Sequence, residues 1–231
     1  MTGYRSNQEE QKEISETDKV LLKDFYKNSD VKKYISSETT DSKIIYITKE
    51  EDINDYPTIK DKLLKFKKIL ESKREAKIGR LPWYSLHWAR EKEMFEGEKI
   101  ICPQRSYQNS FAYNDISWFS SADVYFITKK EDTIDLKYLL GILNSKLCYI
   151  WLYKKGKRKG DMLELYATPL EQIPVKIISK EEQEKYIQVV DRIIELKKLD
   201  KDTQELEKQI DEMVYDLYEL TEEEKELIRN F

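Results

Sequence analysis

The sequence predicts an α+β fold, with a small β-rich core, flanking helices and an antiparallel helical hairpin at the C-terminal end. Short apolar segments alternate with turn residues between Leu81 and Lys130, which is typical of a β-rich unit. Apolar residues recur at helical spacing before and after this unit, and two acidic amphipathic segments follow Ser179. We therefore expect three parts: a helical and strand region at 1–80, the β-rich core at 81–178 and the hairpin at 179–231.

Composition indicates a globular protein. Of 231 residues, 39% are hydrophobic and 37% are charged, whereas only six are glycine and five proline, which excludes collagen-like and low-complexity chains. The apolar runs are shorter than the roughly 20 residues of a membrane span, and the polar start lacks a signal-peptide core, so we expect a cytoplasmic protein. Cys102, Cys148 and the single His87 fit no zinc or disulfide framework, which predicts buried free thiols.

The N-terminal part is expected to contain two helices and a strand. Val20, Leu21 and Phe25 share one face of a predicted helix near "SETDKVLLKDFYKN", and "KIIYIT" at 43–48 is rich in β-branched residues. After Pro57, apolar residues recur at positions i, i+4, i+7 and i+11, which predicts one long helix that ends at Gly79.

The middle and the C-terminal part are expected to hold three strands and several helices. Strands are predicted at 98–103, around 111 and at 123–130, followed by one apolar helix, "DLKYLLGILNSKLCYIWLYKKG". The prolines of "DMLELYATPLEQIPVKIIS" favour an extended segment. Ser179 with Glu182, and Thr221 with Glu224, are capping boxes. The apolar seam of the hairpin must pack on the β-rich unit or on another chain.

Charge is unevenly distributed along the chain. The net formal charge is −4 over residues 1–59, +10 over 60–160 and −10 over 161–231. Residues 137–160 carry seven cations and no acidic residue. A basic middle between acidic ends indicates that one surface faces a polyanion, while the acidic end suits protein contact better than DNA contact.

No motif in the chain predicts catalysis. The phosphate-binding patterns GxGxxG and GxxxxGK[ST] do not occur, and "GKRKG" at 156–160 follows a predicted helix instead of preceding one. His87 has neither a GxSxG elbow nor a cysteine signature beside it. We expect no catalytic residue and no metal site in this chain.

The positive signals are for DNA binding. The segment "CPQRSYQNSFAYND" holds the candidate base-contacting residues Gln104, Arg105, Gln108 and Asn109, whose side chains can form bidentate hydrogen bonds with base edges. The candidate phosphate-contacting residues are the cations Lys154, Lys155, Lys157, Arg158 and Lys159. A polar turn explains the first group equally well, and lysines that stabilise a helix C-terminus are an alternative for the second.

Several strings, taken in order, resemble one protein family. They are "YPTIKDKLLKFKKILESKRE", "WYSLHWARE", "EKIICPQ", "NSFAYND", "DVYFITKK", "LLGILNSKLCYIWL", "LEQIPV" and "IDEMVYDLYELTEEE". This order resembles the TaqI-like C-terminal specificity domain, the target-recognition part of adenine-N6 DNA methyltransferases and of fused type IIG restriction-modification enzymes. The resemblance covers nearly everything from about Tyr34 to the end of the chain.

The resemblance implies a sequence-specific DNA-recognition domain that has no catalytic activity of its own. Its partners would be double-stranded DNA and a methyltransferase domain, either in the same parent chain or in a partner subunit. S-adenosylmethionine, and magnesium if the parent enzyme cleaves DNA, would belong to that catalytic part, whose Asn-Pro-Pro-Tyr-type motif does not occur here. The chain therefore resembles the C-terminal piece of a larger enzyme, or a separate specificity subunit.

Two other functions stay open from the sequence. The chain would be a protein-interaction module if the acidic helices were its working surface, and in that case it would not bind random duplex DNA even at low salt. A standalone nuclease or methyltransferase is disfavoured by the missing motifs. That hypothesis would be closed by an absence of both magnesium-dependent cleavage and methyl transfer.

Overall fold

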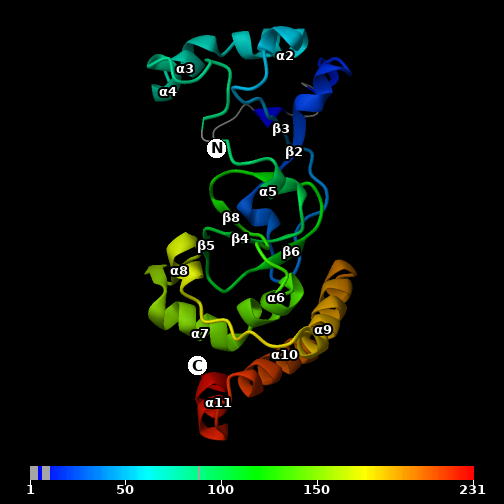
Figure 1. Ribbon diagram of the computed structural model, residues 1–231, viewed down its shortest axis with the longest axis vertical. Helices are drawn as coiled ribbons and strands as arrows, with labels where there is room; N and C mark the ends of the chain where they lie inside the picture. Colours follow the sequence, from blue (N-terminus) through cyan, green and yellow to red (C-terminus); the bar gives the residue numbers. More distant parts are fainter. Residues whose placement is uncertain (1–4, 7–10, 88) are drawn as a thin grey trace. The chain divides into compact units, whose positions relative to one another are not determined.

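A computed structural model describes residues 5–6, 11–87 and 89–231 of the chain (Figure 1). The chain forms two compact units. Unit 1 comprises Met1–Lys27, Glu38–Glu96 and Ser117–Ala122, and unit 2 comprises Asn28–Ser37, Gly97–Ile116 and Asp123–Phe231. The described residues combine α-helices with three small sheets, so the predicted α+β class is confirmed.

Unit 1 contains a sheet of the order β1-β3-β2-β7. Its strands are β1 (Arg5–Ser6), β2 (Leu22–Tyr26), β3 (Lys43–Ile45) and β7 (Phe119–Ser120). Strand β3 confirms the strand predicted in "KIIYIT". Strands β1, β3 and β2 pair antiparallel, whereas β2 and β7 pair in parallel.

The helix predicted near "SETDKVLLKDFYKN" is wrong. This segment forms a short 3₁₀ helix, η1 (Asp18–Leu21), and then strand β2. Phe25 and Tyr26 are both buried, although successive strand residues point to opposite faces, so β2 is covered on both sides. Pairing with β3 and β7 decided the conformation, and neither partner adjoins the segment in the sequence.

The long helix predicted after Pro57 is interrupted twice. The helical elements of unit 1 after η1 are η3 (Ile53–Asp55), α2 (Pro57–Leu64), α3 (Lys67–Glu71), α4 (Arg74–Lys77) and α5 (Glu93–Glu96). Ile59 and Leu63 are buried, whereas Phe66, which lies at the first break, is exposed. Lys73 is extended (ψ 141°) and causes the second break, while Gly79 follows α4 with a left-handed backbone (φ +72°).

Asp18 anchors the start of α2 from a distant position in the sequence. Its buried carboxylate accepts hydrogen bonds from the Thr58 hydroxyl (2.6 Å), the Thr58 amide (2.8 Å) and the Ile59 amide (3.3 Å). Burial alone would raise the pKa of Asp18, but the hydrogen bonds from Thr58, Ile59 and Ser15 lower the pKa on balance.

We expect Asp18→Asn to lower the free energy of unfolding by about 1–2 kcal/mol at pH 7, because the mutation weakens a charged helix cap. A lowered carboxylate pKa stabilises the fold above the ordinary pKa and ceases to do so as pH falls through the folded-state value. The difference between wild type and Asp18→Asn in urea unfolding should therefore shrink as the solution is acidified below pH 4. Asp55→Asn is the exposed control, and an equal effect of both mutations would contradict the assignment.

Unit 2 contains two three-stranded sheets, of the orders β6-β4-β8 and β5-β10-β9. The first consists of β4 (Lys99–Pro103), β6 (Ala112–Asn114) and β8 (Val124–Ile127), and it confirms the three predicted strands. The second consists of β5 (Arg105–Ser106), β9 (Lys157–Lys159) and β10 (Met162–Glu164). A short 3₁₀ helix, η2 (Asn28–Asp30), lies in the segment that unit 2 takes from the N-terminal part of the chain.

The helices of unit 2 follow the prediction with two corrections. They are α6 (Leu136–Asn144), α7 (Lys146–Lys155), α8 (Ala167–Glu171), α9 (Lys180–Lys198), α10 (Gln204–Leu217) and α11 (Glu222–Arg229). Ser145 is extended (ψ 157°) and caps α7, so the predicted single apolar helix is two helices. The expected extended segment contains α8, since Pro169 occupies the first turn, where a helix needs no amide donor.

The predicted helical hairpin is confirmed, and it packs on its own chain. Helices α9 and α10 are antiparallel, because Lys197 meets Glu207 near the turn (2.8 Å) and the Tyr186 hydroxyl donates to the Met213 carbonyl further along (2.9 Å). Both capping boxes are present. The two helices lie against α6 (Figure 1) at Gly141, where a Cβ atom would lie only 3.3 Å from the Val190 side chain. The hairpin seam is therefore part of the core of unit 2.

Candidate nucleic-acid interface

The sheet β5-β10-β9 brings the two predicted DNA-contacting groups together. Strand β10 lies between them, and Glu164 is opposite Arg105 on one side and opposite Lys157 on the other. Because side chains alternate along strands, Arg105, Glu164 and Lys157 share one face of this sheet, and Lys159 shares it with Lys157. The buried Leu163 belongs to the opposite face. The structure thus gives one continuous surface to residues about 50 positions apart in the sequence.

The five cations of 154–159 fall into two structural groups. Lys154 and Lys155 lie in the last turn of α7, where cations offset the helix dipole. Lys157, Arg158 and Lys159 form the exposed edge strand β9, which turns into β10 through Gly160 (φ +62°) and Asp161. The helix-cap alternative therefore applies to the first pair alone, because the other three cations form a strand.

Aromatic rings fix three of these cations. The Arg158 guanidinium lies 4.0 Å from the centroid of the Tyr153 ring, and Lys154 lies 5.1 Å from that of Phe231. Lys157 lies 5.5 Å from the ring of Tyr166. Such contacts typically contribute about 0.5–1 kcal/mol at exposed sites. Arg158 and Lys154 therefore also contribute to packing, whereas Lys155 and Lys159 are exposed without a ring contact among the described residues.

Arg105 is held by a carboxylate on the neighbouring strand. Its Nε donates to the Glu164 Oε1 at 3.2 Å, and the Arg105 side chain is 42% exposed. This bond needs none of the terminal N–H groups, which are the donors that pair with guanine. Sequence reasoning missed Glu164, because only strand register places it beside Arg105.

The other base-reading candidates differ in exposure. Gln108 is exposed, and so is its neighbour Tyr107 at 71%. Gln104 is half-buried, and its backbone bonds to Asp123 and Leu165. Asn109 is buried, and its amide nitrogen donates to the carbonyls of residues 143 (2.7 Å) and 145 (2.8 Å). The side-chain nitrogen of Asn109 therefore bonds to the backbone of the protein and is not available to a DNA base.

A reciprocal exchange between two asparagines joins the strings "NSFAYND" and "GILNSKL". Asn109 satisfies carbonyls at the end of α6, as described above. Asn144 in turn accepts from the Phe111 amide (3.1 Å) and donates to the Phe111 carbonyl (2.9 Å). Both side chains are buried, so each forms its hydrogen bonds with backbone groups inside the protein. The exchange fixes the loop that carries Gln108 against the start of α7.

We expect Asn144→Ala to lower the free energy of unfolding by about 1–3 kcal/mol, because it leaves the Phe111 amide without its partner and removes one of the two hydrogen bonds to the Phe111 carbonyl, which keeps the bond from the Tyr34 amide. Urea denaturation measures the change. Asn230→Ala, which removes an exposed bond to Glu226, is the control and should cost less than about 0.5 kcal/mol. Equal stability of Asn144→Ala and wild type would show that the exchange does not hold the loop.

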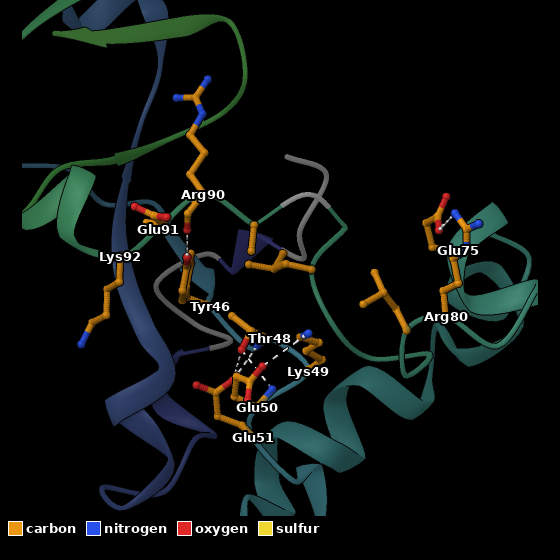
Figure 2. Close-up of a pocket in the computed structure, with 13 residues that line it drawn as sticks. Tyr46, Thr48, Lys49, Glu50, Glu51, Glu75, Arg80, Arg90, Glu91 and Lys92 are labelled. Atoms are coloured by element: carbon orange, nitrogen blue, oxygen red, sulfur yellow. Dashed lines mark hydrogen bonds and ion pairs between the residues drawn. The ribbon is translucent and has the colours of Figure 1, made fainter.

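A cavity of about 680 Å³ in unit 1 is an alternative candidate for a binding site (Figure 2). Tyr46, Leu81 and Leu86 line it together with charged residues. Figure 2 shows the Tyr46 hydroxyl donating to the Arg90 carbonyl and Glu51 accepting from Thr48. Charges of both signs border the cavity, and several of them form ion pairs: Arg80 with Glu75, Lys49 with Glu50 and Lys92 with Glu96. The cavity therefore lacks the single-sign field that selects a charged ligand.

His87 and the cysteines show no arrangement for catalysis. The Nε2 of His87 is buried without a hydrogen-bond partner among the described residues, and burial, with the charge of Lys73, lowers the pKa of His87. Cys102 and Cys148 are buried free thiols, as predicted, and burial raises the pKa of Cys148 to about 12. Within residues 5–6, 11–87 and 89–231, no three His, Cys, Asp or Glu side chains form a metal-binding group. In the same part of the chain, no helix is long and apolar enough to span a membrane.

Comparison with protein families identifies the family of the chain. The model of the TaqI-like C-terminal specificity domain matches residues 23–175, and the chain therefore belongs to this family. The resemblance predicted from the sequence is confirmed.

Three type II methyltransferases are similar to the chain. M.MjaIV of Methanocaldococcus jannaschii is 29% identical over 205 residues, which cover 83% of this chain and 66% of the relative. M.HincII and M.HindII of Haemophilus influenzae are each 31% identical, over 106 and 99 residues, which cover 42% and 41% of this chain. The matches span 21% of M.HincII and 18% of M.HindII. The chain is thus similar to part of each enzyme.

Proposed function

We propose that this chain recognises a specific DNA sequence on behalf of a type II DNA methyltransferase and has no catalytic activity of its own. The observation that carries the proposal is the sheet β5-β10-β9, one face of which holds both the base-reading candidate Arg105 and the cations Lys157 and Lys159 of edge strand β9. A sequence-reading surface needs these two functions side by side, because phosphate contacts set the register in which base contacts are made.

In this proposal the residues have distinct roles. Arg105 and Gln108 contact base edges, and Gln104 supports their loop while reaching toward the same groove. Lys154, Lys155, Lys157, Arg158 and Lys159 contact the phosphate backbone. Asn109 holds the loop in place through its bonds to the end of α6 instead of reading a base.

Catalysis is assigned to another part of the enzyme. We propose adenine-N6 methylation with S-adenosylmethionine there, and magnesium only if that part also cleaves DNA. The two described glycines with positive φ support this assignment, because Gly79 follows a short helix and Gly160 closes a hairpin, and neither forms a glycine loop directly before a helix. The acidic helices α10 and α11 suit contact with the methyltransferase part, which lies in the same chain or in a partner subunit. Because the proposed partner is DNA, we propose that the chain acts in the cytoplasm.

Titration of the full chain against duplex DNA tests the proposal. We expect binding to random duplex at low salt, a steep loss of affinity as salt rises, and tighter binding to duplexes that contain the recognised site. The cognate site can be selected from a randomised duplex pool. Absence of binding at low salt would overturn the proposal and favour a protein-interaction module. Methyl transfer or magnesium-dependent cleavage by this chain alone would overturn its non-catalytic part.

A further inference from the structure

Unit 2 contains a cationic cavity that is separate from strand β9. It has a volume of about 440 Å³ and lies between residues 31–35 and the turn of the helical hairpin. Its lining includes four lysines, Lys32, Lys33, Lys197 and Lys201, and one carboxylate, that of Asp200. The polar residues Gln108 and Ser110 also line it. Four lysines against one aspartate make the lining cationic.

Two of these lysines, Lys33 and Lys197, are held in place by the carboxylate of Glu207. Glu207 accepts from the Lys33 ammonium (2.9 Å) and from the Lys197 ammonium (2.8 Å), and Thr203 donates to the same carboxylate (2.8 Å). An ammonium group has three N–H donors, so each lysine can hold Glu207 and still donate to a ligand. Burial alone would raise the pKa of Glu207, but Lys33, Lys197 and Thr203 lower the pKa on balance, which keeps the carboxylate ionised between the two cations.

The backbone on both sides of the cavity is in an uncommon conformation. Tyr34 has φ +74° and Asp200 has φ +53°, in the left-handed region that costs a bulky residue about 1–2 kcal/mol. The Tyr34 amide donates to the Phe111 carbonyl (2.7 Å), and its buried ring lies 5.6 Å from the Lys33 ammonium and 5.8 Å from that of Lys197. The fold thus keeps a strained residue at Tyr34 and a left-handed turn at Asp200, a residue type that tolerates this conformation, and both turns bring lysines from distant segments to one place.

We propose that this cavity binds a phosphate group of the DNA backbone next to the base that Gln108 contacts. The inference rests on the proposed function, since Gln108 belongs both to the base-reading loop and to the lining of the cavity. Convergent lysine donors with a small polar lining suit a phosphate, which offers several acceptor oxygens and a negative charge. The helical hairpin then contacts DNA at its turn, although its helices are acidic: residues 196–201 hold three lysines and one aspartate.

Charge removal at the cavity tests the inference. Lys32 and Lys201 are exposed, so the pair Lys32→Gln/Lys201→Gln removes two charges without breaking the Glu207 contacts. The matched control is Lys180→Gln/Lys185→Gln, which removes two charges at the far end of α9, about 18–25 Å along the helix from Lys197. Fluorescence anisotropy measures the affinity for duplex DNA across a salt series, and thermal unfolding checks that each variant is folded.

We expect the cavity variant to bind duplex DNA about tenfold more weakly at low salt and its logarithmic salt slope to fall by about 2, with little change in sequence preference. The control should change affinity less than twofold, and Lys32→Arg/Lys201→Arg should retain binding. Wild-type affinity in the cavity variant, or an equal loss in the control, would overturn the inference while leaving the proposed function intact. Failure of the wild type itself to bind DNA would instead overturn the proposed function.

Inorganic phosphate at constant ionic strength separates the two sources of the ligand. If the site serves DNA alone, millimolar phosphate should weaken wild type and the cavity variant equally little. If phosphate weakens wild type toward the level of the cavity variant and leaves the variant unchanged, free phosphate and the DNA backbone compete for the cavity, which supports the assignment. If phosphate protects wild type but not the cavity variant against thermal unfolding, while both bind DNA equally tightly, the cavity binds free phosphate alone, and the assignment to the DNA backbone is wrong.

Discussion

Replacing Lys155, Lys157 and Lys159 with glutamine is expected to weaken binding to duplex DNA about 100-fold at low salt and to reduce the logarithmic salt slope by about 3. Each neutralised phosphate contact removes about 0.9 from that slope, because fewer counterions are released on binding. The loss should be similar for all duplex sequences, since phosphate contacts carry no base information. Anisotropy titrations at several salt concentrations measure both quantities.

The choice of these three lysines follows from their surroundings. Arg158 and Lys154 lie 4.0 Å and 5.1 Å from the rings of Tyr153 and Phe231, so replacing all five cations would also weaken packing. Lys157 is included because its ring contact, with Tyr166, is longer at 5.5 Å. The matched control removes three exposed charges from the hairpin, Lys180, Lys185 and Lys208, and should weaken binding less than about threefold. If the triple variant binds as tightly as wild type at low salt, strand β9 is not a phosphate-contacting surface.

Replacing Arg105 with alanine is expected to relax sequence preference, and to lower the ratio of specific to non-specific affinity roughly 10- to 100-fold. A bidentate arginine contact with guanine typically contributes about 1–3 kcal/mol to discrimination. Because Glu164 holds the Arg105 Nε, Glu164→Gln should reduce the same ratio to a smaller extent by loosening the guanidinium. Selection from a randomised duplex pool, followed by titration of cognate and random duplexes, measures the ratio for each variant.

The control for this prediction is Arg192→Ala, which removes an exposed arginine from α9. It should leave the affinity ratio unchanged. A uniform loss of affinity in Arg105→Ala, with the ratio preserved, would assign Arg105 to the phosphate backbone. An unchanged affinity for every duplex would remove it from the interface.

Local patterns account for much of what was predicted correctly. The boundaries of α9 and α11 follow from the capping boxes at Ser179 and Thr221, where a side chain bonds to an amide three residues away. The strands at 99–103 and 124–127 are marked by β-branched and aromatic residues between turn residues. The family, too, is recognisable from short ordered strings.

Helical spacing alone was misleading in three places. Residues 22–26 form a strand because residues 43–45 pair with one edge of it and residues 119–120 pair with the other edge. The predicted helices break at the extended residues Lys73 and Ser145, and the first of them also breaks at Lys65 and Phe66, although the apolar spacing continues through each break. In each case tertiary contacts outweighed a weak local preference.

The α+β class, the capped C-terminal helices, the basic middle of the chain and the family can all be derived from the amino-acid sequence. The row formed by Arg105, Glu164 and Lys157, and the approach of Lys33 to Lys197 across Glu207, arise only when the chain folds. The physical reason is the range of the interactions. Caps and amphipathic faces depend on residues within a turn or two, whereas the contacts of Arg105 with Glu164 and of Lys33 with Glu207 join residues that are 59 and 174 positions apart.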